Sequence, residues 1–439
     1  MLPVSQTKSG SGFESAHFFC HRPSFQAAPA VAVNWILVAR RVLISAGEAS
    51  GDLYAAELVR ELRRRNPDLD FFGCAGAHMQ QAGVRAVVDA RSLAVVGLAE
   101  VVRHIPRIHG EYRKLLRAAA EEKPDVAILT DSPDFNLRVA RQLKKLGIPV
   151  IYLVAPQVWA WRKGRLPLMR RAIDRLLCIF PFEPQFLTAN GINATYIGHP
   201  LTRLIRPTPD RSELRRKLGL NEQAPLIALL PGSRTGEALR HLPILFEAAE
   251  RIRRAHKGPA PQFILAVPPG TIPAHSIFRE RISRSSIQLL EGRTWDVLAC
   301  AELALAASGT VTIEAALFET PLIAFYRVSK LTWWMGRHLV KVPFYSMVNL
   351  VAGRPIVPEL IQDDLSAARL AKEALRLIED GPARDKMRLE MREVRESLSG
   401  EEYPLAQAAS IVEEYLPCSR NDASRWRNDT LEPSSAVRA

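Results

Sequence analysis

Asp131 is the first residue whose type and position suggest chemistry. It stands in TDSPDFN (130–136), directly after the apolar run DVAILT (125–130). A carboxylate at a strand end can act as a general base that takes the proton from an attacking hydroxyl group. A turn or capping function for Asp131 stays open at this point. Asp134, which follows Pro133, is more typical of a helix cap.

Two turns in the second half of the chain suit a bound diphosphate. LLPGSRTGE (229–237) and ASGTVTIEAA (307–316) each place glycine and small polar residues between an apolar run and a helical pattern. Backbone N–H groups at a helix N-terminus attract anions, and an arginine adds a bidentate fork. The candidate residues are Ser233, Arg234, Ser308, Gly309 and Thr310, with Glu314 as a ligand for a ribose diol or as a capping residue. The pair of turns indicates that this half of the chain binds a nucleotide.

A third turn, GEASGD (47–52), follows the first apolar run. Its glycines permit a tight turn and a close approach of the backbone to a ligand. It is neither a G-x-G-x-x-G motif nor a P-loop. Glu48, Ser50 and Asp52 are its polar residues, and an ordinary strand–helix turn capped by Ser50 or Asp52 is the alternative.

A basic amphipathic segment lies at 96–116. Its apolar residues recur at helical spacing: Leu98, Val101, Val102, Ile105, Ile108, Tyr112, Leu115 and Leu116. Arginine, lysine and histidine lie between them, and Pro106 predicts a break in the helix. Such a segment can lie in a lipid interface, although a helix packed on the core with a solvated basic face has the same pattern. KLTWWMGRHLVK (330–341) carries the same ambiguity between an interface and a core.

The elements that must position these residues are short apolar runs alternating with longer helical patterns. Before a proline-rich break at 200–210, the predicted strands are 42–46, 70–74, 125–130, 149–155 and 175–180; after it, they are 225–230, 262–267, 302–307 and 321–326. Helices are expected at 53–65, 235–254 and 311–318, and throughout 366–416. This order predicts an α/β fold of two doubly wound parallel sheets facing a cleft, with ligands at the carboxyl ends of the strands.

Composition and net charge indicate which classes of partner to expect. The chain has 439 residues, a net charge of +13 and no apolar run long enough to span a bilayer. The charge favours an anionic partner such as a nucleic acid, an anionic lipid or a phosphorylated substrate. Five scattered cysteines form no C-x-x-C pair, and buried free thiols at Cys74 and Cys178 in a reducing compartment are expected. We expect neither a zinc site nor a disulfide framework.

Taken together and in order, the motifs resemble lipid-A-disaccharide synthases. The matching segments are SAGEASGD, GVRAVVDARSLAVVGLAEV, DSPDFN, APQVWAWR, LPGSR, ASGT with EAAL, FYR and NLVAGRPIVPELIQDD, which together span about 40–415. The resemblance implies the GT-B fold: a Rossmann-like acceptor and membrane-facing domain at 39–205, a UDP-sugar-binding domain at 206–385, and C-terminal helices at 386–416 that cross back to the first domain. Residues 1–38 and 417–439 fall outside the pattern and are expected to lack fixed structure.

The resemblance also implies an activity and a site. It is the inverting, metal-independent transfer of 2,3-diacylglucosamine from UDP to 2,3-diacylglucosamine 1-phosphate, without a cofactor. Asp131 would be the base, and Arg234, Ser308, Gly309, Thr310 and Glu314 would line the UDP site, with Tyr326, Arg327 and Asn349 near the donor. The GEASGD loop would face the acceptor, and Leu98, Val101, Val102 and Ile105 would form a membrane patch. The enzyme would be peripheral on the cytoplasmic face of the inner membrane, with a homodimer that exchanges C-terminal parts as a possibility.

Two other readings of the sequence remain. One is another two-domain UDP-sugar enzyme, such as a 2-epimerase or a different glycosyltransferase. The other is a basic nucleotide- or nucleic-acid-binding protein, for which no nucleic-acid motif is present. The acyl-chain length and an ester or amide linkage are open.

Overall fold

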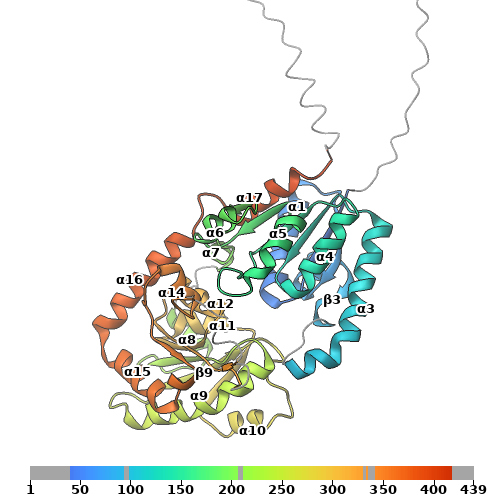
Figure 1. Ribbon diagram of the computed structural model, residues 1–439. Helices are drawn as coiled ribbons and strands as arrows, with labels where there is room; N and C mark the ends of the chain where they lie inside the picture. The colour runs from blue at the N-terminus through green and yellow to red at the C-terminus, as the bar shows by residue number, and fades with distance from the viewer. Residues whose placement is uncertain (1–39, 93–97, 206–210, 330–332, 335–341, 418–439) are drawn as a thin grey trace, which may run out of the picture. The chain divides into compact units, whose positions relative to one another are not determined.

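The computed structural model describes residues 40–92, 98–205, 211–329, 333–334 and 342–417 (Figure 1). Its described residues hold two parallel sheets. The first contains seven strands in the order β3-β2-β1-β4-β5-β6-β7, and the second contains six in the order β10-β9-β8-β11-β12-β13. The two-sheet α/β fold predicted from the sequence is therefore confirmed.

The strand bounds follow the apolar runs. The first sheet consists of β1 (Arg41–Ala46), β2 (Asp70–Ala75), β3 (Arg85–Asp89), β4 (Val126–Thr130), β5 (Val150–Leu153), β6 (Arg175–Cys178) and β7 (Ala194–Tyr196). The second consists of β8 (Leu226–Leu230), β9 (Gln262–Val267), β10 (Ile287–Glu291), β11 (Leu303–Ala307), β12 (Leu322–Tyr326) and β13 (Glu359–Ile361). Strands buried on both faces read as continuous apolar runs, which explains why the central ones were predictable.

Helices cover both faces of the first sheet. Along β1, Val42, Ile44 and Ala46 belong to one apolar cluster, which also holds side chains of α1 (Ala49–Arg65) and α2 (Ala77–Gln81). Leu43 lies in the opposite cluster, with residues of α3 (Leu98–Glu122), α4 (Pro133–Lys145) and α5 (Leu166–Ala172). This alternation is the period of a β-strand.

The remaining described helices belong mainly to the second sheet and to the end of the chain. They are α6 (Glu183–Ala189), α7 (Leu201–Leu204), α8 (Arg211–Lys217), α9 (Thr235–Ala255), α10 (Ile277–Ser283), α11 (Thr294–Cys300), α12 (Thr310–Leu317), α14 (Met347–Ala352), α15 (Ala367–Glu379), α16 (Gly381–Leu398) and α17 (Pro404–Glu413). The expected helical run after Ser366 is thus three helices.

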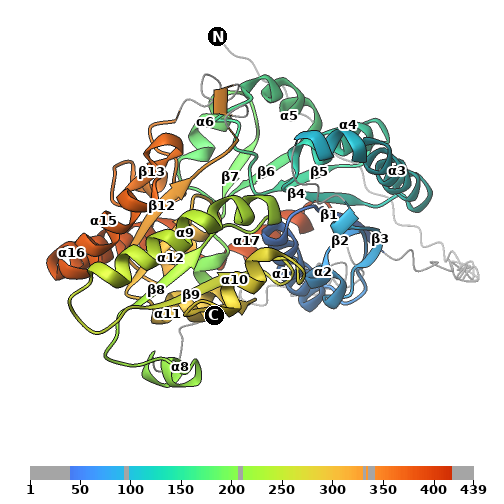
Figure 2. The same ribbon diagram turned by 90° about the horizontal axis from the view of Figure 1, so that it is seen from below.

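The last helix returns to the first sheet. α17 packs against α1, where Arg65 pairs with Glu413 at 3.1 Å and Asn66 donates to the same carboxylate at 2.6 Å. α16 packs instead on α12 and α14 beside the second sheet (Figures 1 and 2). The predicted boundary at 385/386 is therefore too early: it falls inside α16, and the packing changes only near Leu398, whose carbonyl accepts a hydrogen bond from His199 N–H.

Pro106 does not break its helix, contrary to expectation. α3 continues through it to Glu122. A proline removes one helical hydrogen bond and crowds the carbonyl one turn earlier. Pro106 itself is exposed, and the helix tolerates the defect.

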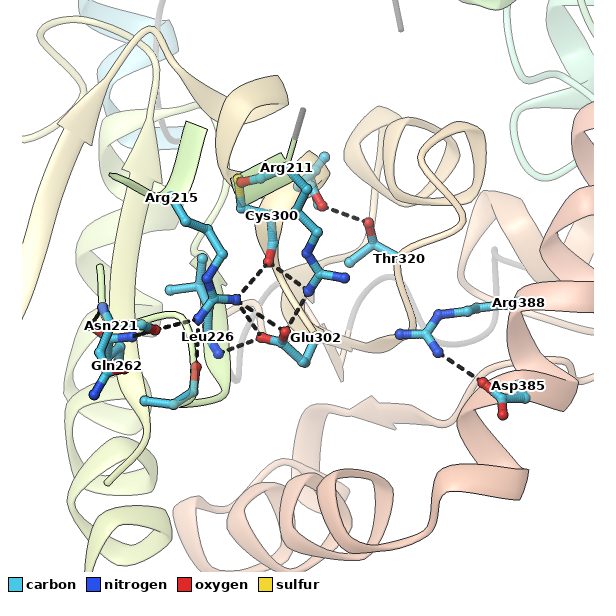
Figure 3. A network of polar contacts seen from close by, with 12 residues as sticks. Arg211, Arg215, Asn221, Leu226, Gln262, Cys300, Glu302, Thr320, Asp385 and Arg388 are labelled. Atoms are coloured by element: carbon cyan, nitrogen blue, oxygen red, sulfur yellow. Dashed lines mark hydrogen bonds and ion pairs between the residues drawn. The ribbon is translucent and has the colours of Figure 1, made fainter. Parts of the chain in front are cut away.

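A buried arginine fixes the amino-terminal edge of the second sheet (Figure 3). Arg215 of α8 is 3% exposed, pairs with Glu302 at 3.0 Å, and donates to the carbonyl oxygens of Asn221 and Ala224. Glu302 also accepts from the N–H of Leu226 at the start of β8. These contacts pair both terminal nitrogens of the buried guanidinium, while its Nε has no hydrogen-bond partner among the described residues.

Candidate active site

The polar turns lie where the strand order of each sheet reverses. GEASGD follows β1 and TDSPDFN follows β4, and these two strands are neighbours. LPGSR follows β8 and ASGT follows β11, which are neighbours in the second sheet. The carboxyl ends of strands at such a switch point are where doubly wound sheets bind ligands. The structure therefore brings the predicted motifs together in pairs.

Asp131 is held by the turn after β1. Its Oδ1 accepts from the N–H of Gly47 at 2.7 Å, and its Oδ2 accepts from the N–H of Glu48 at 3.0 Å. Its backbone has a φ of 50°, in the left-handed region, and its carbonyl accepts from the Tyr152 hydroxyl at 2.6 Å. The side chain is thus fixed in direction by two backbone donors while the residue stays partly exposed.

Burial raises the pKa of Asp131 to about 8, and the nearby Glu48 carboxylate acts in the same direction. The hydrogen bonds from Gly47 and Glu48 oppose this rise because they favour the charged form. A carboxylate with such a pKa is a stronger base than an ordinary aspartate, which suits proton removal from a hydroxyl group near neutral pH.

A glycine makes room for this carboxylate. A Cβ built on Gly51 would lie 1.7 Å from Oδ2 of Asp131. A larger residue there would push the Asp131 carboxylate aside, so the second glycine of GEASGD permits the close approach of α1 to Asp131.

The other polar residues of GEASGD, Ser50 and Asp52, do not have the capping function considered from the sequence. α1 begins at Ala49, earlier than expected, so Ser50 and Asp52 lie inside its first turn, and neither is its cap. Asp52 is 5% exposed and accepts from the N–H groups of Gly76, His78 and Met79. These contacts cap the start of α2, so Asp52 positions the neighbouring turn.

Asp134 is likewise not the cap of its helix. Ser132 occupies the N-cap position of α4, and Asp134 lies in the first turn. Its exposed carboxylate pairs with Arg162 at 2.8 Å and with Arg165.

Arg234 reaches across to the turn after β1. Its Nη2 lies 2.9 Å from Oε1 of Glu48, and this charge raises the pKa of Arg234. Ser233, the preceding residue, is exposed. The exposed Glu48 carboxylate thus links the guanidinium of one sheet to the loop that holds Asp131.

In the turn after β11, some polar groups are exposed and others are hydrogen-bonded within the protein. Thr310 is exposed at the start of α12, with Gly309 at its N-cap, and the Ser308 hydroxyl donates to the Tyr345 carbonyl at 2.5 Å. Glu314 accepts from the Trp295 indole N–H at 3.0 Å, and burial raises its pKa to about 7.

Three further predicted residues are largely occupied by internal contacts. Arg327 donates to the carbonyls of Gln362 and Leu365. Asn349 is fully buried, accepts from the N–H groups of Ile356 and Val357, and donates to Glu359. Burial, with the Glu237 carboxylate as a smaller cause, raises the pKa of Tyr326. Arg327 and Asn349 therefore shape the loops around the turns, and their proximity to a donor stays a prediction.

One buried acid was missed in the sequence. Glu183, 1% exposed at the start of α6, accepts from the Trp159 indole N–H at 3.2 Å and from Phe180 N–H at 3.2 Å. Burial raises its pKa to about 8. The only sequence signal is a glutamate inside the apolar FPFEPQF, because its partner Trp159 lies in a different segment.

The predicted membrane patch is described only in part. Ile105 is 53% exposed, while the side chains of Leu98, Val101 and Val102 lie outside what the structure describes. Of the second basic stretch, only Trp333 and Trp334 are described, and Trp334 is 64% exposed. In the described parts of the chain, no helix is long and apolar enough to cross a bilayer, and no cluster of three potential metal ligands occurs.

The fold is shared with UDP-sugar enzymes and other glycosyltransferases, which defines the class as GT-B. A putative UDP-N-acetylglucosamine 2-epimerase from Listeria monocytogenes aligns with a TM-score of 0.56 at 16% identity, over 85% of this chain and 94% of its own. A glycosyltransferase of kitacinnamycin aligns with a TM-score of 0.58 at 16% identity, over 86% and 99%. At such identities the likeness concerns the fold alone.

Sequence comparison identifies the family within this class. A model of the lipid-A-disaccharide synthetase family matches residues 42–412. The lipid-A-disaccharide synthase of Solibacter usitatus is 54% identical over 86% of this chain and 97% of its own length. That of Myxococcus xanthus is 46% identical over 87% and 98%. The chain belongs to the lipid-A-disaccharide synthase family.

Proposed function

We propose that this protein transfers the 2,3-diacylglucosaminyl group of its UDP conjugate to the 6-hydroxyl of 2,3-diacylglucosamine 1-phosphate. The products are UDP and a β-1,6-linked lipid A disaccharide 1-phosphate. The observation that carries the proposal is the Asp131 carboxylate, oriented by two backbone N–H groups at the switch point of the first sheet in a chain of this family.

The proposed step divides the work between the two sheets. Asp131 takes the proton of the 6-hydroxyl as its oxygen attacks the anomeric carbon, and the bond to UDP breaks on the opposite face, which inverts the configuration. Arg234 and the N-terminus of α12 stabilise the negative charge gained by the leaving diphosphate. These groups supply the stabilisation without a metal ion.

The testing experiment is a mass-spectrometric assay of the purified chain with both diacylated substrates and EDTA. A tetraacyl disaccharide phosphate formed in step with UDP is expected. UDP release without the disaccharide, or turnover of UDP-N-acetylglucosamine in preference to the diacylated donor, would contradict the proposal. Dependence on an added divalent cation would contradict the metal-independent step alone.

The site of action proposed is the cytoplasmic face of the inner membrane, with the protein bound peripherally. The support is the exposed Ile105 on α3, the net charge of +13 and the lipid nature of the family's product. Sedimentation with anionic vesicles should retain the protein at low salt, and Ile105→Glu should weaken that retention. Equal sedimentation of both proteins would remove Ile105 from the membrane contact.

A homodimer that exchanges C-terminal parts is proposed from the family resemblance. Its support in the chain is α17, which already packs on the first sheet's α1 from the far end of the sequence. Light scattering during size-exclusion chromatography should give twice the 48.9 kDa chain mass. The monomer mass at assay concentration would contradict the dimer.

A further inference from the structure

A basic cluster beside the candidate active site has no part in the mechanism so far. Arg162, Lys163 and Arg165 follow β5 and precede α5, and the two arginines pair with the Asp134 carboxylate of α4. α4 and α5 pack together, which holds the two segments in contact. Asp134 lies three residues after Asp131, so their Cα atoms are at most about 11 Å apart.

We propose that Arg162 and Arg165 bind the 1-phosphate of the acceptor sugar, in a subsite now occupied by the Asp134 carboxylate. This inference rests on the proposed function and names the residues that select its acceptor. The Arg162 guanidinium lies 2.8 Å from both carboxylate oxygens of Asp134, and Arg165 contacts Oδ1 of the same group. Two guanidinium groups converging on one anion form the arrangement that binds phosphate by paired N–H···O bonds.

The cations are preorganised by aromatic rings. The Arg162 guanidinium lies 4.3 Å from the centroid of the Trp161 ring, and the Arg165 guanidinium lies 5.8 Å from it. Lys163 lies 5.8 Å from the ring of Phe186. Stacking on a ring leaves the N–H edges of a guanidinium available to an anion. Arg162 has a φ of 57°, and this left-handed turn lets both arginines reach Asp134.

The charges favour an anion. Two guanidinium groups around one carboxylate leave an excess of one positive charge. A phosphate monoester carries about −1.5 to −2 at pH 7. The side chain of Arg165 is only 14% exposed, so its charge is less screened by water than that of an ordinary surface arginine.

The geometry of the acceptor matches this placement. In 2,3-diacylglucosamine 1-phosphate the phosphate is on C1 and the CH2OH arm is on C5, and both carbons flank the ring oxygen. A sugar whose 6-hydroxyl lies at Asp131 therefore carries its phosphate within one ring width. The cluster pairs with Asp134, which is three residues along the chain from Asp131 after β4.

The test compares two acceptors with the full chain at saturating donor: the 1-phosphate and its uncharged 1-O-methyl glycoside. The wild type should prefer the phosphate. Arg162→Gln and Arg165→Gln should each lower kcat/KM for the phosphate acceptor by about 10- to 100-fold, which is the effect of losing a charged hydrogen bond. In both variants, kcat/KM for the methyl glycoside should stay unchanged. Arg165→Lys should fall between, because it keeps the charge and loses the fork.

Matched controls separate this function from folding. Arg171→Gln replaces an exposed arginine of α5 that donates to the Pro167 carbonyl, and it should not change either acceptor. The donor KM and the Tm of the Arg162 variant should stay at wild-type values. An equal loss with both acceptors would overturn the subsite.

Two further outcomes are distinguishable. If the wild type forms no disaccharide from either acceptor, the proposed function fails and the subsite with it. If Arg162→Gln keeps the preference for the phosphate but loses binding to phosphatidylglycerol–phosphatidylcholine vesicles relative to pure phosphatidylcholine, the cluster binds lipid headgroups, and the acceptor subsite is overturned.

Discussion

Asp131 and Glu183 are two carboxyl groups of the same domain with similar chemistry and different surroundings. Each follows a strand of the first sheet, Asp131 after β4 and Glu183 after β6, and each accepts backbone N–H groups. Burial raises the pKa of both to about 8. Glu183 is 1% exposed and hydrogen-bonded to an indole, whereas Asp131 is partly exposed beside the Glu48 carboxylate.

The comparison shows that a raised carboxyl pKa does not by itself indicate a catalytic function. Perturbed carboxyl groups gather at active sites, yet buried structural acids show the same displacement. What distinguishes Asp131 is access: its carboxylate lies at the switch point, near the Arg234 guanidinium through Glu48. Glu183 is 1% exposed and hydrogen-bonded to the Trp159 indole and the Phe180 N–H, so its carboxyl group is not accessible to a substrate.

The largest expected effect comes from removing each acid in turn. Asp131→Asn should lower kcat by about 10²- to 10⁴-fold, the usual contribution of a general base, while UDP still binds. Glu183→Gln should keep kcat within a few-fold because its carboxylate touches no substrate. The measurement is initial rate at saturating substrates, with UDP affinity by calorimetry. Similar losses in both variants would break the distinction.

Gly51→Ala should displace Asp131 without altering its chemistry. The new methyl group would meet Oδ2 of Asp131 at 1.7 Å, so the carboxylate must move. A misplacement of about 1 Å can cost about 10²-fold in rate, which is the loss expected here. Gly110→Ala in α3 is the control, because no neighbouring atom of the described residues outside the helix's own turns lies within 4 Å of its added Cβ, and it should leave the rate unchanged. Normal activity of the Gly51 variant would show that the Asp131 position tolerates movement.

The pH dependence of the free energy of unfolding should reveal the protonation of Glu183. Its folded-state pKa is raised above the unfolded value, so its stabilising contribution is complete below about pH 4 and is lost as the pH rises through about 8. In that window Glu183 should lower the free energy of unfolding by up to about 1.4 kcal/mol per pH unit. Denaturant unfolding from pH 5 to 8 should show a shallower decline for Glu183→Gln. Parallel curves for both proteins would mean that Glu183 is ionised in the fold.

The smallest effect should come from Glu48→Gln. In the wild type, kcat/KM should rise toward pH 8 as Asp131 loses its proton. Removing the Glu48 charge should move this midpoint to lower pH, by about half a unit for a partly screened charge. Glu183 has no such charged neighbour among the causes of its pKa shift, so burial alone accounts for it. If the midpoint does not move, burial alone raises the pKa of Asp131, as it does that of Glu183.

The sequence predicted the interior of each sheet and missed its borders. The four unpredicted strands, β3, β7, β10 and β13, are the outermost strands of the two sheets. Most of their residues are half-buried or exposed, so they lack the continuous apolar run that marks a central strand. Edge strands depend on a neighbour that only the fold supplies.

Site residues can be proposed from the sequence where chemistry and local pattern coincide. Asp131 and Arg234 are candidates because each lies in a short polar turn that follows an apolar run. Asp52 was assigned to the acceptor loop, but its hydrogen-bond partners begin at Gly76. Glu183 escaped notice because Trp159 binds it from another strand end. Contacts between distant segments leave no local pattern.

The packing of α17 on α1 also sets the order in which the molecule can be completed during translation. Arg65 leaves the ribosome 345 residues before its partner Ser410. At roughly 5–20 residues per second, the surface of α1 that α17 covers waits about 17 seconds or more for that helix. We expect the nascent chain to need chaperone protection on that surface. A circularly permuted chain that begins with α17 would shorten the wait.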